Sequence, residues 1–171
     1  CAVACAEAAL AGGATTLAVA AATEAAELAA AGLVGGDGGA TATASGAGPD
    51  GPPELITLGA LTADEVDVVL AAGSAVSVCT EGFRRLVADR ARALGRPARV
   101  HVKHDSGMGR LGTFDGEEVL ALARATAADP DLEPAAVWTH FATADEPDDD
   151  EGYFFEQLDR FEPVAAAVRA E

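Results

Sequence analysis

The sequence predicts an α/β fold of about five parallel strands that alternate with helices. Two observations support this prediction. Short segments with strand-like apolar patterns recur along the chain, and longer segments with apolar residues at helical spacing lie between them. This alternation indicates a parallel sheet, because parallel neighbours need a crossover connection that a helix usually supplies. With 171 residues, 50% of them hydrophobic, the chain is long enough for one domain or part of a larger one.

The elements are expected in strict alternation, beginning with a helix. Helices are predicted at 2–12, 23–32, 62–72, 81–94, 115–128 and 150–170, and strands at 16–21, 54–59, 75–79, 99–104 and 135–141. Asp115 is the expected cap of its helix, and the acidic run 148–151 that of the last helix, because carboxylates favour the positive end of a helix dipole. Residues 35–53 are rich in turn formers and lack a periodic apolar pattern, so they should form a flexible insertion.

The helix predicted at 81–94 lies in the most basic part of the chain. Eight of the eleven basic side chains fall between Arg84 and Arg110. The expected buried stripe of this helix consists of Phe83, Leu86, Val87, Ala91 and Leu94. Its arginines, Arg84 among them, are therefore expected to lie in solvent.

The segment 99–112 is the strongest candidate for a functional site. Its valines alternate with the ionisable residues His101, Lys103 and Asp105, so the strand should have one apolar and one ionisable face. The glycine-rich turn 107–112 follows, and glycines allow a ligand to approach the backbone closely. Within that turn, Arg110 is a permanent, forked hydrogen-bond donor.

Residues 107–112 also match the G-x-G-x-x-G spacing of dinucleotide-binding loops. That fingerprint needs a helix that begins within the glycines, so that its free amides face the pyrophosphate. Here Thr113, Phe114 and Asp115 postpone the helix until after the last glycine, which disfavours nicotinamide binding.

Composition argues against several classes of partner. A net charge of −17 disfavours nucleic acid, because its phosphates would be repelled. Cys1, Cys5 and Cys79 have no second ligand pair at zinc-like spacing, so no metal is expected. Acidic residues interrupt the alanine-rich stretches before they reach the ~20 residues of a membrane span, and no signal peptide is visible. A reduced, cytoplasmic protein without a membrane partner is the expectation.

The segment 99–112, Arg-Val-His-Val-Lys-His-Asp-Ser-Gly-Met-Gly-Arg-Leu-Gly, resembles the fifth-strand signature of alanine racemases. It departs from that signature at Ser106, where the family has threonine, and at His104, where the family has an apolar residue. Residues 138–146 resemble the family's sixth-strand histidine motif, and Gln157, Arg160 and Phe161 follow it with the family's spacing. A weaker similarity to the second strand and its helix covers 16–28. Together these segments follow the family's order along nearly the whole chain.

The resemblance implies a partial TIM (β/α)8 barrel and pyridoxal 5′-phosphate chemistry that interconverts L- and D-alanine. It assigns catalytic roles to Arg110 and Lys103: the matching arginine hydrogen-bonds the phenolic oxygen of the cofactor, and the matching lysine is often carbamylated and orients that arginine. Cofactor binding falls to Arg110 and to His140, which matches a histidine beside the pyridine ring. Asp145 matches an aspartate at the substrate entrance. The family further implies a homodimer that supplies D-alanine for peptidoglycan.

An incomplete barrel domain is expected over 1–171, because five strands cannot close a barrel of eight. Aligned to the family, the sequence begins after the motif with the cofactor-binding lysine and ends before strands seven and eight. The carboxy-terminal β domain, with the catalytic tyrosine, also has no counterpart. The chain by itself is therefore expected to be inactive.

Each predicted site residue also has a structural alternative. Lys103 could keep its amine in water at a strand end, His140 could be a core histidine satisfied by a backbone carbonyl, and Asp145 could cap the last helix. The alternative functions are a related aldolase or decarboxylase with the same barrel and cofactor, and a non-catalytic protein that binds the cofactor. Met108 and Leu111, which flank Arg110, favour the racemase.

Overall fold

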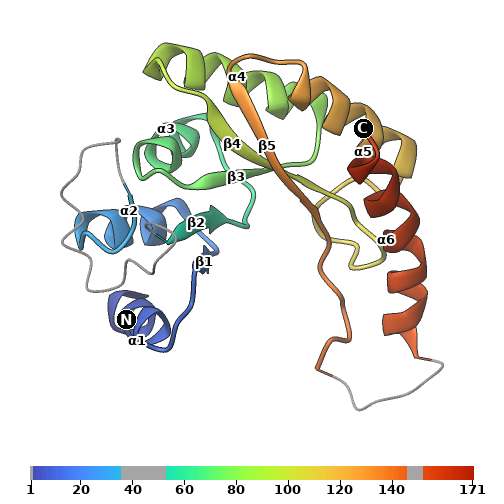
Figure 1. The fold of residues 1–171 in the computed structure, drawn as a ribbon, viewed down its shortest axis with the longest axis horizontal. Coiled ribbons are helices and arrows are strands. Elements are labelled where there is room, and N and C mark those ends of the chain that lie inside the picture. Colours follow the sequence, from blue (N-terminus) through green and yellow to red (C-terminus); the bar gives the residue numbers. More distant parts are fainter. Residues whose placement is uncertain (1, 36–52, 146–151) are drawn as a thin grey trace. The chain divides into compact units, whose positions relative to one another are not determined.

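The computed structural model of the chain describes residues 2–35, 53–145 and 152–171 (Figure 1). These residues form six helices that alternate with five strands, which confirms the predicted α/β class. They divide into two compact units, Cys1–Ser77 and Val78–Glu171. The insertion predicted at 35–53 falls, apart from Gly35 and Pro53, outside the described residues, and so does the acidic run 148–151.

The first unit contains three parallel strands with helices between them. Its elements are α1 (Ala2–Ala11), β1 (Thr16–Val19), α2 (Ala22–Ala30), β2 (Glu54–Thr57), α3 (Ala63–Ala71) and all but the last residue of β3 (Ala75–Val78). β2 pairs in parallel with β1 and with β3. Leu17, Leu28 and Leu55 belong to one buried cluster, in which α1 and α2 pack against β1 and β2. The apolar residues that give these helices and strands their periodic patterns therefore pack into one shared core.

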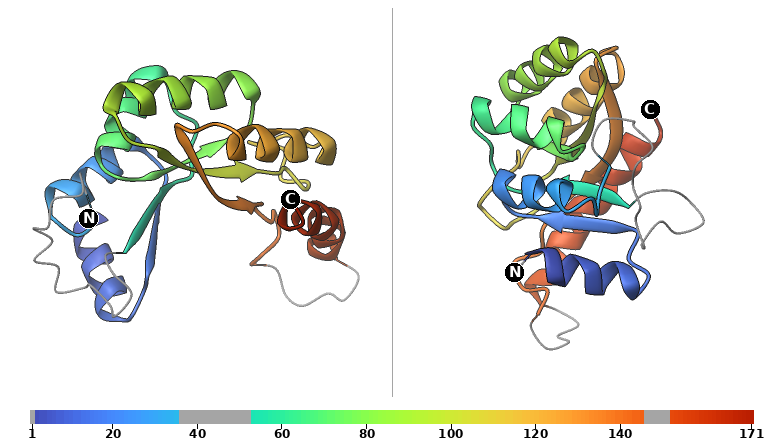
Figure 2. Two further views of the ribbon diagram at one scale, coloured as in Figure 1. Left: turned by 45° about the horizontal axis from the view of Figure 1, so that its top comes forward. Right: turned by 90° about the vertical axis from the view of Figure 1, so that its left-hand side faces the viewer.

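The second unit carries the segment that sequence analysis singled out. Its elements are α4 (Glu81–Leu94), β4 (Ala98–Lys103), α5 (Gly116–Ala127), β5 (Leu132–Trp138) and α6 (Tyr153–Arg169). β4 and β5 pair in parallel, from Ala98 opposite Leu132 to Lys103 opposite Trp138. α4 and α5 pack beside one another and against both strands, while α6 packs against α5 and β5 (Figure 2). From Val100 to Lys103 every residue of β4 is buried, as expected for a parallel strand covered on both faces.

The local start of α5 agrees with the sequence-based prediction. The side chain of Asp115 caps the helix by accepting a hydrogen bond from the Glu117 amide at 2.9 Å. The helix begins only at Gly116, so the turn 107–112 lies entirely outside it. The helical amides that would face a pyrophosphate in a dinucleotide fold do not belong to this glycine turn.

The prediction that β5 covers 135–141 is displaced from the observed strand, Leu132–Trp138. Pairing with β4 extends the strand towards its amino end across Pro134, which has no amide hydrogen to donate and lies at the register shift between Val100 and His101. In a sequence pattern, a proline favours the end of a strand. Here the residues on both sides of Pro134 still pair with β4, so the strand continues through it. The consequence is that His140 lies in the loop after β5.

The expectation that Arg84 lies in solvent is wrong, because only 7% of this residue is exposed. Its guanidinium bonds Glu81 at 2.8 Å and Asp129 at 2.8 Å. Leu94, which was expected in the buried stripe, is 46% exposed. The buried face of α4 thus includes an arginine, since the turn before β5 provides an anion that the helix pattern alone does not reveal.

Candidate functional site

Lys103 ends β4 with its side chain in the interior, and the residue is 1% exposed. Its Nζ atom has no hydrogen-bond partner among the described residues and lies 3.9 Å from the centroid of the Trp138 ring. Burial lowers the pKa of Lys103, the charges of Cys79 and Asp105 oppose this, and Arg110 lowers the pKa further. The interpretation of Lys103 as a strand-end lysine with its amine in water is therefore wrong.

The turn after β4 carries Arg110 on a backbone that Asp105 holds in place. Asp105 Oδ1 accepts hydrogen bonds from the Gly107 amide at 2.9 Å and the Gly109 amide at 3.0 Å. Burial raises the pKa of Asp105, but hydrogen bonds from the turn amides outweigh it and leave that pKa below its ordinary value. Gly112 has a φ of +115°, and a Cβ there would lie 2.8 Å from the Asp105 amide nitrogen. Arg110 itself is exposed at the tip of this ordered turn.

His140 and Asp145 both follow β5 and are both exposed. The backbone oxygen of His140 accepts a hydrogen bond from Gln157 Nε2 at 3.4 Å. An exposed loop histidine is not a core histidine, so that alternative is wrong. Roles for His140 and Asp145 toward a cofactor or substrate stay predictions.

The pairing of β4 with β5 brings the predicted site residues to one edge. Lys103 lies opposite Trp138, the last residue of β5, so the turn with Arg110 and the loop with His140 leave the two strands at neighbouring points. The carboxyl ends of parallel strands are where βα proteins place their ligand-binding loops. Lys103 and Arg110 from one motif and His140 from another therefore lie at or beyond the carboxyl ends of adjacent strands.

His104, one of the two departures from the family signature, directly follows β4. It is buried, with 2% of the residue exposed. Its ring stacks on Phe161 of α6 with centroids 6.1 Å apart, and its Nδ1 has no partner among the described residues. Burial lowers the pKa of His104, whereas a hydrogen bond to the Phe114 backbone and the charge of Asp105 oppose this shift. The site around the β4 end thus favours uncharged forms of two successive basic residues.

Helix α6 contacts both loops, and sequence analysis missed one of the residues that do so. Gln157 and Arg160 were noted only for their spacing, while Tyr153 was not singled out. The Tyr153 hydroxyl donates to the Gly107 carbonyl oxygen at 2.8 Å. No local pattern marks this contact, because the two residues are 46 positions apart.

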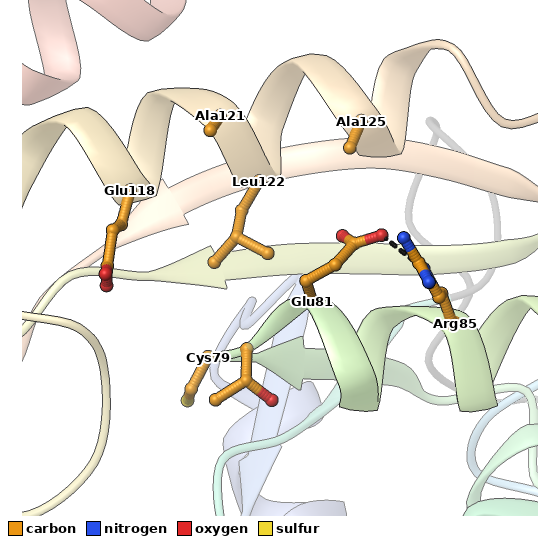
Figure 3. Close-up of a pocket in the computed structure, with 8 residues that line it drawn as sticks. Cys79, Glu81, Arg85, Glu118, Ala121, Leu122 and Ala125 are labelled. Carbon is orange, nitrogen blue, oxygen red and sulfur yellow. Dashed lines mark hydrogen bonds and ion pairs between the residues drawn. The ribbon is translucent and has the colours of Figure 1, made fainter.

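A separate cavity of about 540 Å³ opens between α4 and α5 (Figure 3). Ala121, Leu122 and Ala125 of α5 lie on one side, and Cys79 precedes α4 on the other. Burial raises the pKa of the Cys79 thiol, against smaller opposing effects of Lys103 and the Gly112 backbone. None of the predicted site residues lines this cavity.

Two further features of the described ranges bear on the possible functions. They contain no group of three or more histidine, cysteine or acidic side chains that could hold a metal ion. Of the helices in these ranges, none combines the length and the apolar character that crossing a bilayer requires.

Comparison with known proteins identifies the family. The model of the alanine racemase N-terminal domain matches residues 1–171. An alanine racemase of Desulforamulus reducens is 36% identical over 153 residues, which are 90% of this chain and 36% of that protein. An alanine racemase of Chlorobaculum tepidum is 39% identical over 105 residues, or 61% of this chain and 26% of that protein. The chain therefore matches about a third of the length of these relatives or less.

Solved structures agree with this match. Alanine racemase from a D-cycloserine-producing Streptomyces lavendulae superposes with a TM-score of 0.78 and 31% identity over 99% of this chain and 40% of that one. An alanine racemase of Clostridium difficile 630 superposes with a TM-score of 0.82 over 99% of this chain and 39% of that one; at 24% identity, it shows the fold alone. These similarities confirm the predicted barrel-type fold. The chain belongs to the alanine racemase family, and the part of the family that it matches is the N-terminal domain.

Proposed function

We propose that the protein containing this chain is an alanine racemase that interconverts L- and D-alanine with pyridoxal 5′-phosphate. Family membership supports the reaction, and the state of Lys103 carries the assignment of the site. Its amine is buried, without a hydrogen-bond partner among the described residues, and its pKa is lowered. Carbon dioxide reacts only with a neutral amine, so this environment suits a carbamylated lysine whose new carboxylate pairs with the guanidinium of Arg110.

The residues of this chain fit the cofactor. When bound, pyridoxal phosphate makes the α-proton of an amino acid acidic, because its ring accepts the negative charge. Arg110 would donate to the phenolic oxygen, and His140 would pack beside the pyridine ring. Both side chains belong to exposed residues in loops after parallel strands, where βα barrels bind ligands. The buried amine of Lys103, which has no hydrogen-bond partner in the part of the chain that the structure describes, is the observation that supports this fit.

In the proposed reaction, this chain would orient the cofactor and hold the positive charge of Arg110 in place beside it. Arg110 presents a planar fork of donors, while Asp105 keeps the backbone of its turn in one conformation through the Gly107 and Gly109 amides. Asp145 would lie where an amino-acid substrate enters. The proposal includes a cytoplasmic homodimer as the full-length form and D-alanine for peptidoglycan as its product; family membership alone supports these points.

Racemisation of L-alanine in deuterium oxide tests the proposal. The full-length protein with pyridoxal phosphate should form D-alanine, detected with D-amino-acid oxidase, and should place deuterium at Cα, detected by NMR. Release of carbon dioxide from an amino acid, or of an aldehyde from a β-hydroxy amino acid, without any D-alanine would contradict racemisation and favour the decarboxylase or aldolase. Cofactor binding without turnover of any of these substrates would favour the non-catalytic alternative.

A further inference from the structure

We propose that Gln157 and Tyr153 are positioning residues, which hold from α6 the backbones of the two loops that carry Arg110 and His140. The inference rests on the proposed function, because it assigns to α6 a part in the same reaction. It goes beyond the contacts of the side chains that would touch the cofactor, since neither Gln157 nor Tyr153 is among them.

The first observation concerns Gln157, which is completely buried at 0% exposure. Its Oε1 accepts a hydrogen bond from the Ala142 amide at 2.8 Å, and its Nε2 donates to the His140 carbonyl oxygen at 3.4 Å. β5 ends at Trp138, so these backbone groups lie beyond the strand ladder. A buried amide side chain that pairs with both a donor and an acceptor of the backbone replaces the missing ladder at this point.

The second observation concerns the approach of Tyr153 to the turn. The Tyr153 hydroxyl donates to the Gly107 carbonyl oxygen at 2.8 Å. A Cβ at Gly107 would lie 2.4 Å from that hydroxyl oxygen and 3.1 Å from Gln157 Cγ, and the φ of Gly107 is +144°. Only glycine combines this conformation with such a close approach. The turn with Arg110 therefore contacts α6 at a backbone position that favours glycine.

The third observation is that the two loops are also joined directly. Ser106 and Thr139 share a hydrogen bond between their hydroxyl oxygens at 2.8 Å. Arg160 Nη1 donates to the Ser106 carbonyl oxygen at 3.2 Å. The turn, α6 and the loop after β5 thus form a closed set of contacts. Loss of one contact should move Arg110 relative to His140, and misplacement on the order of 1 Å can cost about 100-fold in rate.

The experiment compares three variants of the full-length protein with its cofactor. Gln157→Met keeps the volume of the side chain and removes both hydrogen bonds. Tyr153→Phe removes only the hydroxyl. Glu162→Gln changes an exposed residue of the same helix and is the matched control. We expect kcat to fall about tenfold to 100-fold in Gln157→Met and about threefold to tenfold in Tyr153→Phe, as for the loss of buried and partly exposed hydrogen bonds. KM for alanine should change less than kcat.

Two further readouts separate positioning from general stability. The visible absorption band of the bound cofactor should shift in Gln157→Met and not in Glu162→Gln. Hydrogen exchange at the Ala142 amide should accelerate about tenfold or more in Gln157→Met, with or without cofactor. Gly107→Ala should impair the protein, and adding Tyr153→Phe should restore part of the loss, because the atom nearest to the new Cβ is then absent.

Each outcome decides the inference. Unchanged kcat, absorption band and Ala142 exchange in Gln157→Met would overturn it. So would a fall in kcat that only matches a loss of folded protein, measured by thermal unfolding. If the wild-type protein does not racemise alanine, the proposed function fails, and the cofactor-free exchange of Ala142 still shows whether α6 holds the loop.

Discussion

At the scale of single residues, burial has the same effect on Lys103 and His104, although the consequences differ. The two residues are adjacent in the sequence, at the end of β4. Each is at most 2% exposed, and burial lowers the pKa of each. For Lys103, a lowered pKa favours the neutral amine, the form that the proposed carbamylation requires. For His104, the lowered pKa couples folding to pH, because a proton on Nδ1 would find no acceptor in the described ranges.

Substitution of Lys103 and Arg110 tests their proposed roles. Lys103→Ala in the full-length protein should lower racemisation on the order of 100-fold, because Arg110 loses the carboxylate that orients it. Added formate or acetate should restore part of the activity. Arg110→Lys should impair turnover as well, since a point charge does not replace the guanidinium fork. The exposed Arg99→Lys on the same strand is the control. Unchanged turnover in both site variants would make Lys103 and Arg110 structural.

His104 should make the free energy of unfolding depend on pH. Its folded-state pKa lies below the ordinary 6.5, so the unfolded chain takes up the proton first and stability falls as the pH drops below about 6.5. The charged groups that act on it are Asp105 and Lys103. In His104→Leu this part of the pH dependence should disappear. Urea unfolding at several pH values measures it: the difference in stability between wild type and variant should be constant above about pH 7.5 and change below about 6.5. A constant difference throughout would contradict the linkage.

At the scale of elements, the sequence predicts the bounds of α4 and the start of α5 more accurately than the bounds of β5. The predicted bounds 81–94 coincide with those of α4, and the Asp115 cap begins α5 as expected. Both depend on contacts within a few residues. β5 differs because its extent is decided by pairing with β4, a neighbour that its own sequence pattern does not describe. The same distinction applies to Arg84, whose partner Asp129 is 45 positions away.

Arg84 should contribute more to stability than its neighbour on α4. Arg84→Met removes the guanidinium that donates to Asp129 Oδ2 and leaves Asp129, within the described residues, only the Asp131 amide, and we expect a loss of about 1–3 kcal/mol in the free energy of unfolding. The matched control Arg85→Met removes a side chain that is 72% exposed and should change stability by less than about 0.5 kcal/mol. Chemical denaturation of both variants measures the difference. Equal effects would show that the buried ion pair contributes nothing beyond an ordinary surface contact.

At the scale of the whole molecule, charge is the property that the sequence describes most directly. The 171 residues carry a net charge of −17, so compaction brings like charges together. The urea midpoint of the chain should therefore rise from low salt to about 0.5 M sodium chloride, because the added ions screen this repulsion. A double variant, Asp159→Asn with Glu162→Gln, should show a smaller rise. A midpoint that is unchanged or lowered by salt would contradict the prediction.

The sequence by itself determined the alternation of strands and helices, the glycine turn with Arg110, and the family to which these motifs point. These features depend on short-range periodicity, caps and residue order, which are legible within a few positions. Only the tertiary structure decided that the Lys103 amine is buried against Trp138, that His140 is exposed, and that Tyr153 and Gln157 form hydrogen bonds with the backbones of the two loops. The physical reason is that burial and hydrogen-bond partners depend on segments 15 to 46 positions apart, which packing brings together and no local pattern records.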